Sequence, residues 1–282
     1  MTLWIEVAVR VETPADLAIV EALACAHALR GTAIEEQPPT LRAWFSEDER
    51  ESAEALRTAI AAAVPRATAS VAPVDDVAWG DAWREHFRPQ RIGEIAIVPS
   101  WERAAFREPA RAVVEIDPGQ AFGTGLHPTT RGCLLHLQEM DLTGRTLTDV
   151  GTGSGILALA AAMLGARRVY ACDVDPVAVR AARENAGRNG LAQRVRVERI
   201  SADLAGAPAA QVVVANLTAD IILGLAPALR ALMEPGGVLL LAGIVGEREG
   251  EVVQALAALG LRSPVRRGDG EWVSLRFRAG IP

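Results

Sequence analysis

The stretch Asp149–Gly155, with the sequence DVGTGSG, separates an apolar segment that we expect to be a strand from one that we expect to be a helix. Glycines let a backbone turn tightly and approach a ligand that a Cβ atom would block. A loop that binds a pyrophosphate has the spacing GxGxxG, but position 156 is isoleucine. We therefore expect Gly151 and Gly153 to contact a ligand without phosphates, and Asp149 to receive its cationic amine.

Two further carboxylates follow the next two predicted strands. Asp173 stands about 20 residues after the glycine loop, where a carboxylate can accept hydrogen bonds from both hydroxyls of a ribose. Asp203 follows the third strand, where an adenine amino group would need an acceptor, and a solvated loop aspartate is an equally good interpretation. Asp175 precedes Pro176 and is better explained as a helix N-cap. These carboxylates predict a nucleoside, which both NAD and S-adenosylmethionine contain.

Asn216 follows the fourth predicted strand and is one of only three asparagines in the chain. Ligands of parallel sheets bind outside the carboxyl ends of the strands. Asn216 is therefore predicted at the reaction centre, where a side-chain or backbone carbonyl can accept a hydrogen bond from an incoming amine. The competing interpretation is an N-cap for the next helix. Because asparagine is rare in this chain, we favour the catalytic role.

The C-terminal two thirds of the chain alternates between apolar strands and longer helices, which predicts a parallel sheet covered on both faces. The predicted strands are 146–150, 168–173, 194–199, 211–215 and 237–242, and the helices are about 155–165, 176–189, 218–233 and 246–259. Two last strands, 261–267 and 271–278, are separated only by a turn at 268–270, and a tight turn forces antiparallel pairing. This α/β pattern matches the seven-stranded, mostly parallel class I methyltransferase sheet. Together with Ile156, it argues against an NAD-dependent oxidoreductase.

Residues 1–72 predict a separate, small ferredoxin-like α+β domain, because the elements occur in the order strand, helix, strand, strand, helix, strand. The predicted ranges are 3–10, 14–31, 32–36, 40–46, 49–63 and 67–71. This segment carries no chemical motif, so we expect it to serve in substrate recognition. A linker helix with Trp79 and Trp83 on one face is expected within 73–90. The catalytic domain then covers 91–282, with additional strands over 92–116.

Composition narrows the class of protein. The formal net charge is −6 and no cluster of basic residues occurs, so we expect no direct reading of nucleic acid and a basic protein as the better partner. No apolar stretch reaches the roughly 18 residues of a membrane span. Cys25, Cys133 and Cys172 are far apart and predict a reduced, cytoplasmic protein. The histidines have no acidic or cysteine partners at ligand spacing, so no metal site is predicted.

The loop 117–130, DPGQAFGTGLHPTT, is rich in glycine and ends at a helix start, as do many loops that close over ligands. His127 alone would suggest an acid or a base, but the following Pro-Thr-Thr favours a helix start. With DVGTGSGILA, CDVDP and VVVANL in this order, the chain resembles the ribosomal protein L-eleven (L11) methyltransferases, the PrmA family. GTGxHPTT is the specific signature. GEW, residues 270–272, also fits, so the resemblance covers the whole chain.

The resemblance implies an enzyme that transfers methyl groups from S-adenosylmethionine to lysine ε-amines and to the N-terminal α-amine of ribosomal protein L11, up to trimethylation. The N-terminal domain would recognise that protein. The implied cofactor contacts are Thr130, Gly151, Asp173 and Asn216, with Phe122, Gly123 and Thr124 lining the site. The chain lacks the Asn-Pro-Pro-aromatic motif of amide and adenine methyltransferases, which favours an aliphatic amine as acceptor.

Two other functions fit the same residues. The chain could methylate other protein lysines or a small amine, since the groove residues alone do not define the acceptor. It could also be a non-catalytic module that uses the cofactor structurally, although Asn216 argues against this.

Overall fold

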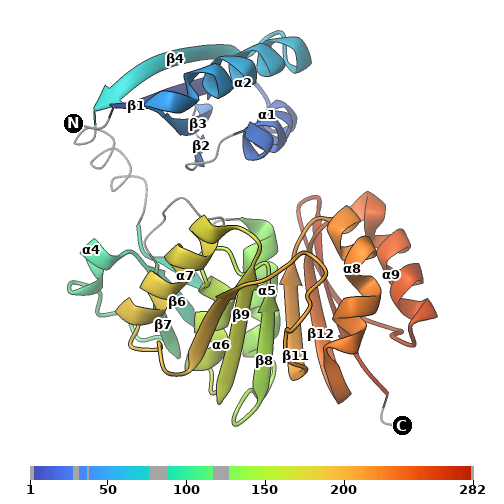
Figure 1. The fold of residues 1–282 in the computed structure, drawn as a ribbon. Coiled ribbons are helices and arrows are strands. Elements are labelled where there is room, and N and C mark those ends of the chain that lie inside the picture. Colours follow the sequence, from blue (N-terminus) through green and yellow to red (C-terminus); the bar gives the residue numbers. More distant parts are fainter. Residues whose placement is uncertain (1–2, 28–31, 37, 76–87, 117–126, 281–282) are drawn as a thin grey trace. The chain divides into compact units, whose positions relative to one another are not determined.

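The chain divides into two compact units, Met1–Arg88 and Pro89–Pro282, which are described separately (Figure 1). The structure is a computed structural model and describes residues 3–27, 32–36, 38–75, 88–116 and 127–280. The predicted linker helix, with Trp79 and Trp83, lies outside the described residues, as does the side chain of Cys25.

The first unit is a four-stranded antiparallel sheet with two helices. Its elements are β1 (Leu3–Arg10), α1 (Pro14–His27), β2 (Thr32–Glu36), β3 (Pro39–Ser46), α2 (Arg50–Ala63) and β4 (Thr68–Asp75). The strand order is β2-β3-β1-β4, as the predicted ferredoxin-like order of elements requires. Ile5, Val7 and Val9 alternate along β1 and are buried in one core cluster with Leu56 and Ile60 of α2. Strand β4 extends to Asp75, three residues beyond the end of the domain that the sequence predicted over residues 1–72.

The second unit contains the predicted seven-stranded sheet. Its strands are β8 (Thr146–Val150), β9 (Arg168–Asp173), β10 (Val195–Arg199), β11 (Ala210–Asn216), β12 (Met233–Val245), β13 (Val265–Asp269) and β14 (Trp272–Arg278). The order is β10-β9-β8-β11-β12-β14-β13. Neighbours from β10 to β12 pair in parallel, and β14 pairs antiparallel with both β12 and β13. The fold class predicted from the sequence is therefore confirmed.

Helices cover both faces of this sheet (Figure 1). They are α5 (Pro128–Gln138), α6 (Ile156–Met163), α7 (Pro176–Arg188), α8 (Ala219–Ala231) and α9 (Glu249–Ala258). Along β11, Val212 and Val214 belong to the core cluster of α5, α6 and α7, whereas Val213 and Ala215 belong to that of α8 and α9. Successive side chains of a strand point to opposite faces, so both faces of β11 are buried and the strand is apolar throughout.

The C-terminal hairpin turns later than the sequence suggested. Gly268 pairs with Val273 and Asp269 pairs with Trp272, so the turn consists of Gly270 and Glu271 rather than residues 268–270. Gly270 has a φ of +59°, which two-residue hairpin turns require and glycine adopts without strain. The antiparallel pairing inferred from a tight turn is nevertheless confirmed.

A small three-stranded sheet accounts for the additional strands expected over residues 92–116. It consists of β5 (Gln90–Ile92), β6 (Ile95–Val98) and β7 (Ala112–Glu115), and a short helix, α4 (Ser100–Arg103), follows β6. Its apolar residues join the core cluster of α5, α6 and α7. Within the described part of the chain, every helix is too short or too polar to cross a membrane.

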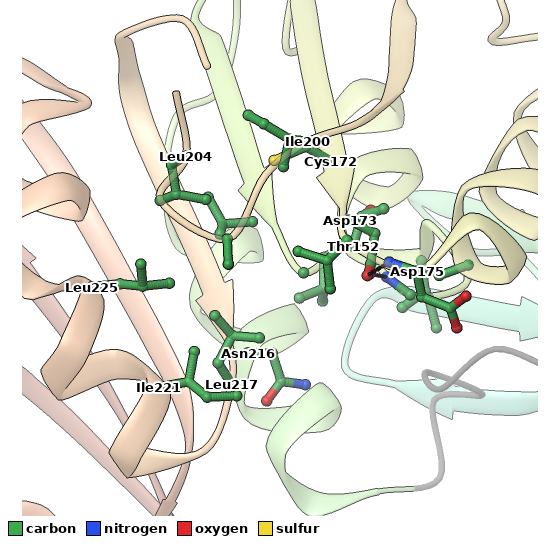
Figure 2. Close-up of a pocket in the computed structure, with 18 of the residues that line it drawn as sticks. Thr152, Cys172, Asp173, Asp175, Ile200, Leu204, Asn216, Leu217, Ile221 and Leu225 are labelled. Carbon is green, nitrogen blue, oxygen red and sulfur yellow. Dashed lines mark hydrogen bonds between the residues drawn. The ribbon is translucent and has the colours of Figure 1, made fainter. Parts of the chain in front are cut away.

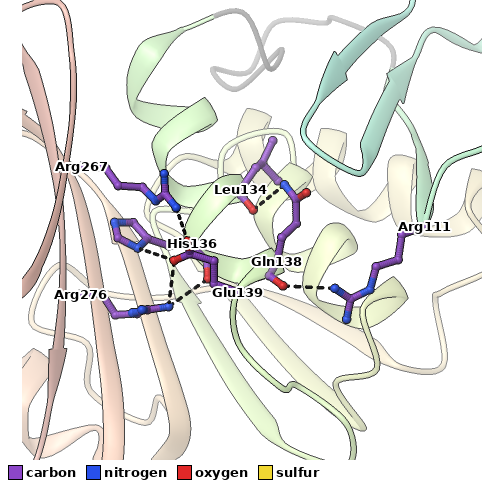
Figure 3. Close-up of polar contacts among 7 residues, drawn as sticks. All are labelled: Arg111, Leu134, His136, Gln138, Glu139, Arg267 and Arg276. Carbon is purple, nitrogen blue, oxygen red and sulfur yellow. Dashed lines mark hydrogen bonds and ion pairs between the residues drawn. The ribbon is translucent and has the colours of Figure 1, made fainter.

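A polar cluster surrounds the C-terminal end of α5 (Figure 3). The His136 side chain is fully buried, and its Nδ1 lies 3.9 Å from Oε2 of Glu139. Glu139 also pairs with Arg267 and Arg276 of the C-terminal hairpin. Burial lowers the pKa of His136 to about 4, and the charges of Arg276 and Arg267 add to this effect. His136 is therefore a neutral core residue at physiological pH.

The His136→Leu variant should make folding stability less sensitive to acid. An unfolded histidine takes up its proton near pH 6.5, whereas His136 in the folded protein does so only near pH 4. The unfolded state binds more protons between these values, so the free energy of unfolding falls as the pH drops from 6.5 to 4. Removing His136 should reduce this slope by up to about 1.4 kcal/mol per pH unit. Urea denaturation at several pH values measures it, and an unchanged slope would contradict the assignment.

Candidate active site

The glycine loop between β8 and α6 forms one wall of a groove at the carboxyl ends of the parallel strands. Gly151, Gly153 and Gly155 have φ values of +70°, +55° and +86°, which side-chain-bearing residues rarely adopt. The amides of Gly151 and Thr152 donate hydrogen bonds of 2.9 and 3.0 Å to the carbonyl of Cys172. The predicted loop is thus anchored to the end of β9, and each of the three glycines is needed by the backbone.

A second part of the groove lining begins with Asn216 and Leu217, and Leu217 approaches two glycines closely. A Cβ atom on Gly151 would lie 2.5 Å from Cδ2 of Leu217, and one on Gly243 would lie 2.2 Å from the Leu217 carbonyl oxygen. The Leu217 amide donates a 3.0 Å hydrogen bond to the carbonyl of Ala242. The path of the chain after β11 therefore depends on the absence of side chains at both glycines.

Asp173 ends β9 with its carboxylate held by backbone donors. The amide of Gly153 donates to Oδ2 and the amide of Asp175 donates to Oδ1, each at 3.0 Å. A carboxylate oxygen can accept more than one hydrogen bond, so both oxygens keep capacity for the hydroxyls of a ribose. Asp175 itself caps α7 by accepting from the amide of Val177 at 2.7 Å, as predicted.

Asp149 is buried behind the glycine loop and does not itself line the groove. Its Oδ2 accepts a 2.7 Å hydrogen bond from the hydroxyl of Thr152, while Oδ1 has no hydrogen-bond partner among the described residues. Burial raises the pKa of Asp149 to about 7, with a smaller contribution from the charge of Asp173, and the bond from Thr152 opposes this rise. A cationic group near the loop would stabilise the ionised form.

Asn216 ends β11 and faces the first turn of α5. Its Nδ2 donates to Oγ1 of the buried Thr130 at 3.5 Å. The N-cap of α8 is Thr218, so the alternative role of Asn216 as a helix cap is wrong. Thr130 and Asn216 both line the groove, and Figure 2 shows Asn216 and Asp173 on different sides of it.

Asp203 does not reach the groove in the structure, although its neighbours Ala202 and Leu204 line it. Its Oδ1 accepts hydrogen bonds from the hydroxyl of Ser201 and, at 3.1 Å, from the amide of Ala205. The bond from Ser201 contributes most to lowering the pKa of this exposed carboxyl. The geometry therefore favours the solvated loop aspartate over the acceptor for adenine.

The groove encloses a cavity of about 450 Å³, within the range of small-molecule sites. Besides the predicted residues, its lining includes Ile156 and aliphatic side chains that the sequence did not single out: Leu157, Val174, Ile200, Leu204, Leu217, Ile221 and Leu225. Val174 and Ile221 are 51% and 46% exposed, which is unusual for large apolar residues. The available signal in the sequence was an apolar residue directly after strand β9 for Val174, and one in the first turn of the helix after β11 for Ile221. Such a lining suits a flat ring such as adenine.

The remaining predicted residues are accounted for as follows. Phe122, Gly123 and Thr124 lie outside the described residues. His127 is the N-cap of α5, and its side chain accepts from the amide of Thr129, which confirms the helix start. Among the described residues, no group of histidine, cysteine and acidic side chains could hold a metal ion.

Comparisons with known proteins agree on one family. The family model described as ribosomal protein L11 methyltransferase (PrmA) matches residues 4–280. The ribosomal protein L11 methyltransferase of Geobacter metallireducens is 43% identical over 86% of this chain and 82% of its own length. That of Pelotomaculum thermopropionicum is 45% identical over 76% of this chain and 70% of its own length. The crystal structure of a ribosomal protein L11 methylase from Lactobacillus delbrueckii is 32% identical, with a TM-score of 0.64, and covers 69% of this chain and all of the other chain.

The Gly243→Ala variant should be markedly less stable than a matched control. Gly144 has a φ of +72° and open space around it, so Gly144→Ala should cost only the left-handed backbone, about 1–2 kcal/mol. Gly243 has a φ of +84°, so Gly243→Ala should have the same backbone cost. The free energy needed to displace the Leu217 carbonyl should be added to it. Chemical denaturation of both variants measures the difference. Equal losses would mean that the close approach to Leu217 contributes nothing.

Proposed function

The chain belongs to the ribosomal protein L11 methyltransferase (PrmA) family, and on this premise we propose that it transfers methyl groups from S-adenosylmethionine to lysine ε-amines and the N-terminal α-amine of ribosomal protein L11. The observation that carries the proposal is that Gly151, Asp173 and Asn216, from three different strand ends, line one cavity. We further propose a cytoplasmic location, because the substrate is a ribosomal protein.

The residues of the groove fit S-adenosylmethionine. Gly151 and Gly153 line the cavity without side chains that would narrow it, and both oxygens of the Asp173 carboxylate keep capacity to accept hydrogen bonds from two hydroxyls. When ionised, Asp149 adds negative charge behind the loop, where it would favour a cation. The aliphatic side chains of Ile200, Leu204 and others in the lining would hold the adenine, without a direct contribution from Asp203.

Catalysis in this groove would consist mainly of positioning. When bound, S-adenosylmethionine supplies a methyl group that is already activated by a sulfonium. Asn216 would accept a hydrogen bond from the incoming amine and direct its lone pair towards the methyl carbon, with Thr130 holding the amide side chain. A lysine amine has an unperturbed pKa near 10.4, and desolvation in the groove would lower it. Proton loss to water is then sufficient, and no residue is assigned as general base.

The proposal is tested with unmethylated ribosomal protein L11, S-adenosylmethionine and the purified protein, followed by mass spectrometry of the substrate. We expect mass increases in multiples of one methyl group. The Asn216→Ala variant should lower kcat by a factor on the order of 10² while cofactor affinity stays close to wild type. Asp173→Asn should instead weaken cofactor binding by about tenfold, measured by calorimetry, because it removes a charged acceptor.

Three results would contradict this assignment. Methylation of other proteins or of small amines but not of L11 would identify a different acceptor. Cofactor binding without turnover to S-adenosylhomocysteine would indicate a non-catalytic module. Wild-type kcat in Asn216→Ala would remove that residue from the reaction centre.

We also propose that the N-terminal unit recognises the protein substrate. Its core cluster contains only its own residues, and the clusters of the second unit contain only residues after Pro89, which supports independent folding. Deleting residues 1–88 should therefore leave the cofactor dissociation constant unchanged while abolishing methylation of L11. Calorimetry and the mass assay provide the two measurements. Undiminished L11 methylation by the shortened protein would refute the recognition role.

A further inference from the structure

Two aromatic rings from distant parts of the sequence meet beside the groove. The rings of His127 and Trp272 lie with their centroids 4.9 Å apart, at an interplanar angle of 67°. Trp272 is the last residue of the GEW motif and the first of β14. The groove described above uses neither ring, and both side chains are only half-buried.

The pair lies at the same edge of the sheet as Asn216. On β12, Ala242 pairs with Asn216, and Val245, slightly further along the strand, pairs with Trp272. On the other side, His127 begins α5, and Thr130, the partner of Asn216, belongs to the first turn of the same helix. One helical turn therefore connects the aromatic pair to the proposed reaction centre.

The first turns of α5 are held firmly against the C-terminal hairpin. Arg131 binds Asp269 at 2.7 Å, and Gly132 approaches β14 so closely that a Cβ atom would lie 2.6 Å from Oγ of Ser274. Nδ1 of His127 accepts from the amide of Thr129, which fixes the orientation of the ring. These contacts hold His127 against the hairpin that carries Trp272, and the two rings pack on one another.

We propose that His127 and Trp272 form the wall that binds the alkylammonium part of the acceptor, a lysine side chain or a peptide amino terminus. This inference rests on the proposed function and specifies how the acceptor is recognised. The face of a tryptophan attracts ammonium groups, and aromatic side chains are the usual partners of methylated ammonium. The apolar parts of both rings would also pack against the alkyl stem.

The charges around the pair suit a cationic acceptor. Burial and the neighbouring Arg131 lower the pKa of His127 to about 4, so this ring is neutral at physiological pH and does not repel an ammonium group. Asp269 neutralises Arg131, and the side chain of Glu271, next to Trp272, is exposed. Arg266, which lies near Gly268, pairs with Glu249, so the exposed Glu271 adds a negative charge beside the aromatic surface.

The wall would also continue to bind the amine after it has been methylated. Each transfer forms one N–C bond and breaks one S–C bond, and a mono- or dimethylated ammonium must lose a proton to water before it can react again. Binding to the tryptophan face does not require an N–H donor, so it persists as methyl groups replace the hydrogens. The same nitrogen can then be held for another transfer.

The test compares Trp272→Leu with Trp272→Phe, and uses Trp101→Leu in α4 as the control for loss of a half-buried tryptophan elsewhere in the same unit. Trp272→Leu should lower kcat/KM for ribosomal protein L11 by about tenfold and shift the products towards lower methylation states, from the usual strength of a cation–π contact. Trp272→Phe should retain most of the activity because it keeps a ring. Cofactor affinity should be unchanged in all three variants.

An activity-independent measurement separates this inference from the proposed function. Tetramethylammonium, used as the probe, should shift the NMR signal of the Trp272 indole N–H in the wild-type protein, and the Trp272→Phe spectrum assigns that signal. If the protein binds the probe but does not methylate L11, the proposed function fails while the cation site stands. If the probe has no effect, or if Trp272→Leu methylates L11 like the wild type, the aromatic wall is refuted.

Discussion

The groove depends on how closely the chain after β11 approaches the ends of its neighbouring strands. Leu217 lies against the bare Cα atoms of Gly151 and Gly243, and its amide is bonded to Ala242. This packing places Asn216 opposite Asp173 across a single cavity. Because protein interiors are close-packed, a displacement of the Leu217 peptide would be passed on to Asn216. The relative position of Asn216 and Asp173 is thus a consequence of backbone packing rather than of side-chain hydrogen bonds alone.

Much of the site could be predicted from the sequence because its residues follow strand ends. In a parallel sheet the carboxyl ends of the strands lie at one edge, so Gly151, Asp173 and Asn216 come together once the alternation of strands and helices is recognised. The conformation of the loop depends on glycines with positive φ, and the Asp173 carboxylate is held in part by the nearby backbone amide of Asp175. Both are local features of the sequence. Local rules also predicted the cap formed by Asp175 and the helix start at His127.

What the sequence did not reveal depends on contacts between distant segments or on how a loop uses its own polar groups. The aliphatic side chains of Val174 and Ile221 resemble ordinary surface residues until the groove brings them together. Asp203 has the expected position along the chain, but Ser201 and Ala205 bind its carboxylate within the loop. The observed hairpin turn differs from the predicted one because its register is set by pairing with the rest of the sheet. The turn residues alone do not determine this register.

Charge explains why this loop suits a sulfonium nucleoside better than a dinucleotide. Ile156 is buried where a pyrophosphate-binding loop would need its third glycine. Behind the loop, Asp149 and Asp173 are close enough for the charge of Asp173 to raise the pKa of Asp149. A phosphate group would increase this repulsion, whereas a bound cation would relieve it and favour the ionised form of Asp149. By thermodynamic linkage, the ionised form in turn binds a cation more tightly, so these two carboxylates favour a positively charged ligand.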